Sequence, residues 1–97
     1  MLSLEPNNGE VKMDNQIDFA IGLMRYGRIY DAIRVLNQAF DDEKNPRTAY
    51  YLASCYEQIG DRHKALLWYQ QSKFLGNTNV DEILNNLYTN LGLVPVV

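Results

Sequence analysis

The 97 residues match the length of one small domain, with a net charge of −3, 46% hydrophobic residues and 22% charged residues. This balance is typical of a globular chain and counts against a nucleic-acid partner, because phosphate binding needs a basic face. With one cysteine, Cys55, and one histidine, His63, the chain can form neither an internal disulfide nor a Cys/His zinc site, so we expect no metal and no cofactor. It shows no signal-peptide pattern and no run of about 18 apolar residues, which predicts a soluble, cytoplasmic protein without a membrane span.

An internal repeat organises the chain, because the segments 15–27, 48–60 and 80–92 can be aligned and each ends in a glycine. Gly27 and Gly60 are 33 residues apart, and Gly60 and Gly92 are 32 residues apart. Apolar positions align down the three segments: Phe19 with Leu52 and Leu84, Leu23 with Tyr56 and Tyr88, and Tyr26 with Ile59 and Leu91. After the first two glycines, Ala32 aligns with Ala65 and Leu36 with Tyr69. Each full unit is therefore predicted to be a helix, a glycine turn and a second helix.

In chain order, the pattern predicts a flexible N-terminal segment over residues 1–12 and then helices over 14–26, 29–41, 47–59, 62–74 and 79–91. Gly27 and Gly60 end the first and third helices, because glycine accepts the left-handed conformation that a tight turn requires. Pro46 suits the first turn of the third helix, and Asp61 is the expected N-cap of the fourth.

The last helix has the clearest pattern, with an apolar stripe at helical spacing opposite a fully polar face. The stripe consists of Val80, Ile83, Leu84, Leu87, Tyr88 and Leu91, and Asn77, Thr78 and Asn79 are N-cap candidates. A helix with one solvated face is what the end of a repeat array needs, so we interpret this helix as a cap. Residues 93–97 form an apolar tail that folds back, reaches a second chain or is an idle terminus.

These residues resemble the tetratricopeptide repeat (TPR), whose pattern is W-x2-L-G-x2-Y, A-x3-F and P. The first unit reads Phe19-Ala20-x2-Leu23, Ala32-x3-Leu36 and Pro46, and the second reads Leu52-Ala53-x2-Tyr56 and Ala65-x3-Tyr69. The tryptophan position holds Gln16, Ala49 and Asp81, and the family's glycine is replaced by Ala20, Ala53 and Asn85. The resemblance implies an all-α, right-handed superhelix of antiparallel helix pairs with about five helices: repeats 13–45 and 46–77 and a half-repeat or capping helix 78–92.

In that family the concave face, lined by the first helix of each pair, binds peptides or helices. The resemblance therefore implies a partner-binding groove made of residues turned away from the aligned apolar positions: Asp14, Ile17, Ile21, Met24, Arg25, Arg47, Tyr50, Ser54, Glu57 and Asn86. Ile17, Ile21 and Met24 beside Tyr50 would form an apolar patch, and such a patch on a small protein suits an amphipathic helix of a partner. The alternative is that the patch packs under the chain's own Leu2, Leu4 and Val11.

The expected apolar groove and the family resemblance together predict a protein-binding adaptor or chaperone. We expect no enzyme, because the sequence contains no Ser/His/Asp set, metal cluster or phosphate loop. Short TPR proteins of this size also resemble the export chaperones of type III secretion, which keep needle or translocator subunits monomeric. That narrower resemblance implies a short helical client. The rival interpretation is a structural subunit of a homo-oligomer or larger assembly, in which the incomplete third repeat and the tail 93–97 dock onto neighbouring chains.

Overall fold

The computed structural model describes the backbone of residues 8–93 and the side chains of residues 15–93. Five α-helices and one 3-10 turn follow each other in this range, and it contains no strand: α1 (Asn8–Arg25), α2 (Ile29–Asp42), α3 (Pro46–Gln58), α4 (Arg62–Phe74), the 3-10 turn η1 (Thr78–Val80) and α5 (Asp81–Asn90). The predictions of an all-α chain and of five helices are confirmed.

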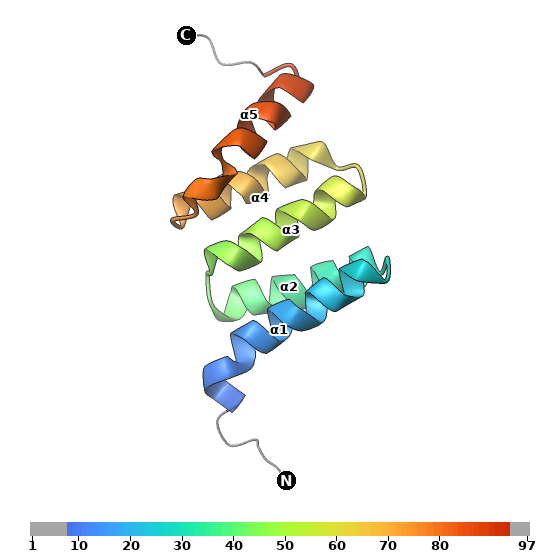
Figure 1. The fold of residues 1–97 in the computed structure, drawn as a ribbon, viewed down its shortest axis with the longest axis vertical. Helices are drawn as coiled ribbons and strands as arrows, with labels where there is room; N and C mark the ends of the chain where they lie inside the picture. Colours follow the sequence, from blue (N-terminus) through green and yellow to red (C-terminus); the bar gives the residue numbers. More distant parts are fainter. Residues whose placement is uncertain (1–7, 94–97) are drawn as a thin grey trace.

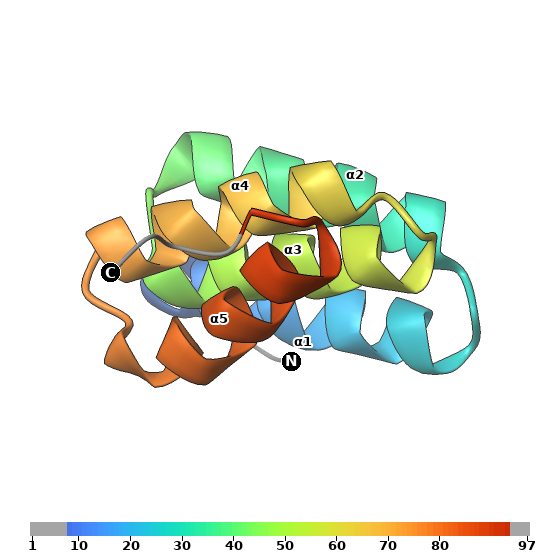
Figure 2. The ribbon, with the colours of Figure 1, turned by 90° about the horizontal axis from the view of Figure 1, so that it is seen from above.

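Each helix packs against its neighbours along the chain, and α1 also contacts α3. The result is an elongated stack of 57 × 27 × 18 Å, with α1 at one end and α5 at the other (Figure 1). Seen along the long axis, α1, α3 and α5 lie on one side of the stack, and α2 and α4 lie on the other (Figure 2). Residues from α3 and α5 are thereby brought onto a common side of the molecule.

The turns between paired helices contain glycines in the left-handed conformation, as predicted. Gly60 has φ +86° and donates its N–H to the Glu57 carbonyl at 3.1 Å, and Asp61 N–H bonds to the Tyr56 carbonyl at 2.9 Å. These two bonds satisfy carbonyls at the end of α3 that the helix itself leaves unpaired. The same pair of bonds, around a glycine with positive φ, ends α1, α4 and α5.

The helix starts are set by local capping. Pro46 is the first residue of α3, as predicted, and Asn45 is its N-cap, with its side chain accepting from Arg47 N–H at 2.7 Å. Asp61 caps α4 by accepting from Lys64 N–H at 3.1 Å, which confirms that prediction. The first helix begins at residue 8 rather than 14. The residues Glu-Val-Lys-Met at 10–13 contain no helix breaker, but the helix also includes Gly9, a poor helix former.

The core forms two adjoining clusters. Ala20 of α1, Leu36 and Phe40 of α2 and Leu52 of α3 belong to the first cluster, and α3, α4, η1 and α5 supply the second. Phe40 meets Trp68 edge-on, with 5.0 Å between ring centroids, and this contact joins α2 to α4.

Two residues aligned with core positions lie on the surface instead. Phe19 is 61% exposed and Tyr26 is 86% exposed, whereas Leu52, the counterpart of Phe19, is fully buried. The reason is position in the stack: Leu52 packs in the cluster that contains Leu36 of the preceding helix α2, and among the described residues no helix precedes α1.

Candidate functional site

Two of the residues predicted from the sequence, Arg47 and Tyr50, line a cleft between α3 and the chain around η1 and α5. We call this the α3–α5 cleft, and define it by Arg47, Tyr50, Tyr51, Asn77, Asn79 and Ile83. Its volume is about 240 Å³, which is the scale of a few side chains rather than of a whole small ligand.

Hydrogen bonds through the buried Ser72 hydroxyl hold the two sides of this cleft together. Asn77 Nδ2 donates to Ser72 Oγ at 3.0 Å, and Ser72 Oγ donates to the Pro46 carbonyl at 2.7 Å. Asn77 Oδ1 also accepts from Asn79 N–H at 3.0 Å and so caps η1. The start of α3 and the turn before α5 are therefore fixed relative to each other, which preforms the cleft.

The walls of the cleft are aromatic. The Tyr50 ring meets the Tyr51 ring edge-on at 5.2 Å and the Tyr69 ring at 5.7 Å, while the Arg47 guanidinium lies 6.0 Å from the centroid of the Tyr51 ring. Aromatic rings packed edge to face in this way offer rigid apolar area, and the adjacent guanidinium and amide groups can bind carboxylate or peptide oxygens. This chemistry suits a polypeptide segment with one apolar face.

Farther along α3, Glu57 is already engaged within the fold. Tyr69 Oη donates a 2.8 Å hydrogen bond to Glu57 Oε1, and burial together with this carboxylate raises the pKa of the Tyr69 phenol well above its ordinary value. Tyr69 therefore stays protonated, and its hydroxyl fixes the position of the exposed Glu57 side chain.

The other predicted groove residues are not gathered into one exposed patch. Ile17 is fully buried, so its side chain is closed to a partner in this structure, and Ile21 and Met24 are half-buried. Ser54 is half-buried, and Arg25 and Asn86 are exposed. The side chain of Asp14 and the covering residues Leu2, Leu4 and Val11 lie outside the described side chains, as do the tail residues 94–97.

Four residues of the cleft were missed as site residues in the sequence. Asn77 and Asn79 were assigned to helix capping and Ile83 to the apolar stripe, while Tyr51 carried no prediction. The signal that could have located them is the asparagine pair just before the last helix, because a turn there brings η1 back to the start of α3.

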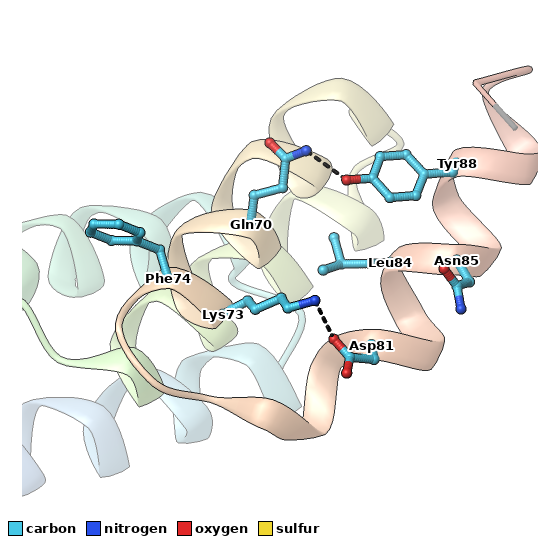
Figure 3. Close-up of a pocket in the computed structure, with 7 residues that line it drawn as sticks. All are labelled: Gln70, Lys73, Phe74, Asp81, Leu84, Asn85 and Tyr88. Atoms are coloured by element: carbon cyan, nitrogen blue, oxygen red, sulfur yellow. Dashed lines mark hydrogen bonds and ion pairs between the residues drawn. The ribbon is translucent and has the colours of Figure 1, made fainter. Parts of the chain in front are cut away.

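A second groove, of about 470 Å³, lies between α4 and α5 and is bridged by polar side chains (Figure 3). Lys73 Nζ lies 2.8 Å from Asp81 Oδ1, and Gln70 Nε2 donates to the Tyr88 hydroxyl at 2.9 Å. The hydrogen bond and charge of Asp81 raise the pKa of Lys73. In the preceding repeat the residue aligned with Asp81 is Ala49, which is fully buried, whereas Asp81 is exposed. The α4–α5 groove therefore faces solvent, unlike the matching position between the earlier helices.

Cys55 and the side chains that could bind a metal were the remaining candidates for a reactive site. Burial raises the pKa of the Cys55 thiol to about 11, which keeps it protonated and unreactive near neutral pH. Within residues 15–93 no group of three or more His, Cys, Asp or Glu side chains is placed to hold a metal ion. None of the helices described is both long enough and apolar enough to cross a membrane. No family model, curated protein or solved structure matches the chain.

Proposed function

We propose that the chain is a TPR-like protein-binding module, an adaptor or chaperone that holds an amphipathic helix or peptide of a partner along the face formed by α1, α3 and α5. The α3–α5 cleft is the observation that carries the proposal. It combines apolar walls from Tyr50, Tyr51 and Ile83 with a rim of Arg47 and Asn79, so one segment could insert apolar side chains and place a carboxylate near the guanidinium.

The preformed cleft supports binding over catalysis. Its aromatic walls are fixed by ring contacts, and the Asn77–Ser72–Pro46 hydrogen bonds fix its ends, so a partner would not need to order these groups. A narrower proposal, resting on the family resemblance, is that the partner is a helical needle or translocator subunit of type III secretion, which the module keeps monomeric.

Site-directed photo-crosslinking in the native cells tests the proposal directly. A photo-reactive amino acid replaces Asn79 or Asn86 on the proposed binding side, and Gln38, which is exposed on α2, provides the control position. We expect the probes at positions 79 and 86 to crosslink to the same protein, through one amphipathic helix identified by mass spectrometry. Crosslinks of equal yield at Gln38 would overturn the assignment of the site.

A charge reversal then measures the contribution of the cleft. Arg47→Glu should weaken binding of the crosslinked helix by about tenfold or more, because arginines at aromatic sites are frequent binding hot spots. Arg62→Glu, an exposed arginine at the start of α4 that does not line the cleft, is the matched control and should change affinity by less than about twofold. Equal affinities of the wild type and Arg47→Glu, with unchanged circular dichroism, would refute the proposal.

A further inference from the structure

The outer face of α1 carries two exposed aromatic side chains, Phe19 and Tyr26. Helical spacing places six residues on this face: Asn15, Asp18, Phe19, Gly22, Arg25 and Tyr26. Phe19 is 61% exposed and Tyr26 is 86% exposed. Among the described elements α1 contacts α2 and α3, and the side of α1 turned away from these two helices faces outward at one end of the described part of the molecule (Figure 1).

The two ends of the stack differ in chemistry. At the far end, the groove between α4 and α5 also carries an exposed aromatic residue, Phe74, but it is bridged by the Lys73–Asp81 ion pair and the Gln70–Tyr88 hydrogen bond. No such polar bridge spans the described part of the outer face of α1, which instead presents two aromatic rings. Large exposed aromatic side chains on one helix face are typical of a surface that binds another protein.

Gly22, at the centre of the outer face, has no explanation within the single chain. It lies inside α1 without a positive φ, where glycine costs about 1 kcal/mol relative to alanine. A Cβ added to it would meet nothing within 4 Å. A glycine in mid-helix that the chain's own packing does not require is accounted for by close approach of a second helix from outside.

The charges of Asp18 and Arg25 favour a second copy of α1 packed against this face in the antiparallel orientation. Asp18 and Arg25 are exposed on the same flank, seven residues or about 10 Å apart along the helix, and neither is paired with another described side chain. Two copies of α1 packed in parallel would place like charges opposite each other. Packed antiparallel about a two-fold axis at Gly22, each Asp18 meets the partner's Arg25, and each Phe19 meets the partner's Tyr26.

We infer that the outer face of α1 is a self-complementary dimer interface, in which a second copy of this chain packs its α1 antiparallel across Gly22. A single helix pair buries less area than the roughly 1,200 Å² of a stable interface, so the dimer dissociates on dilution. The α3–α5 cleft is formed by other helices and remains available in both states.

Sedimentation velocity of the full chain over a range of concentrations tests this inference. The wild type should shift from monomer to dimer as its concentration rises. Asp18→Arg should raise the dissociation constant about tenfold or more, and Arg25→Asp should do the same, because each places like charges opposite each other. The double variant Asp18→Arg/Arg25→Asp restores complementarity and should dimerise like the wild type. A monomer at every concentration, or a dimer indifferent to both single reversals, would overturn the inference.

A second variant separates an interface from a role in helix stability. Gly22→Gln should raise the thermal stability of the monomer, since glutamine favours a helix more than glycine does, and should weaken the dimer because its side chain blocks close approach. A gain in stability with unchanged dimerisation would show that Gly22 is not at the interface. Arg62→Asp, an exposed charge reversal at the start of α4, is the control and should change the dissociation constant of the dimer by less than about twofold.

Discussion

Ser72 Oγ of α4 donates a 2.7 Å hydrogen bond to the carbonyl oxygen of Pro46, the first residue of α3. Ser72 is fully buried and also accepts a hydrogen bond from Asn77. One hydroxyl thus links the start of α3, the end of α4 and the turn that leads to α5. The position of the α3–α5 cleft therefore depends on a residue that does not line it.

Replacing Ser72 with alanine should lower the free energy of unfolding by about 1–2 kcal/mol, because the half-buried side-chain amide of Asn77 and the Pro46 carbonyl both lose a hydrogen-bond partner. Urea denaturation followed by circular dichroism measures the loss. Ser54→Ala on α3 is the matched control, since Ser54 is half-buried and takes part in no such chain, and it should change stability by less than about 0.5 kcal/mol. Equal effects of the two substitutions would contradict the role assigned to Ser72.

Two phenylalanines with opposite environments provide a second test. Phe40 is 8% exposed and packs edge-on against Trp68, whereas Phe74 is 83% exposed. Phe40→Ala should cost about 3–4 kcal/mol, and Phe74→Ala should cost less than about 0.5 kcal/mol. Guanidinium denaturation of both variants, compared with the wild type, measures the difference. A Phe40→Ala variant as stable as Phe74→Ala would show that the α2–α4 contact does not support the fold.

The features predicted correctly from the sequence are those decided by neighbouring residues. The turn at Gly60 and the cap at Asp61 each involve residues within a few positions along the chain, so the local sequence determines them. Apolar periodicity predicted α2 to α4 with bounds within one residue of those observed.

The candidate site was harder to predict because it depends on which elements lie next to each other. Phe19 aligns with core positions in the repeat but is exposed at the end of the stack. Ile17, which was expected either in an apolar groove or under the N-terminal segment, is fully buried. The repeat pattern treats all units alike, whereas among the described elements α1 packs against helices on one side only. Asn79 and Ile83 line the cleft because the η1 turn brings this part of the chain next to α3, and helical periodicity does not predict the path of such a turn.

The chemistry of Cys55 gives a third prediction. Its thiol is buried and its pKa is raised to about 11, so at pH 8 less than about 1% is thiolate, the reactive form. We expect alkylation by iodoacetamide at pH 8 to be far slower in the native protein than in urea, where the pKa returns to its ordinary range. Mass spectrometry over time measures both rates. Native alkylation as fast as that of the unfolded chain would mean that Cys55 is not enclosed by the packing of α3.

Gly60 and Gly22 should respond in opposite directions to the same substitution. Gly60 has φ +86°, where an alanine is strained, so Gly60→Ala should destabilise the protein by about 1–2 kcal/mol. Gly22 lies within α1 with open space around it, so Gly22→Ala should stabilise the monomer by about 0.5–1 kcal/mol through helix propensity. Thermal denaturation at a concentration low enough to keep the chain monomeric measures both. If Gly22→Ala were destabilising under those conditions, α1 would not be a regular helix at its centre, and the antiparallel packing proposed across Gly22 would lose its geometric basis.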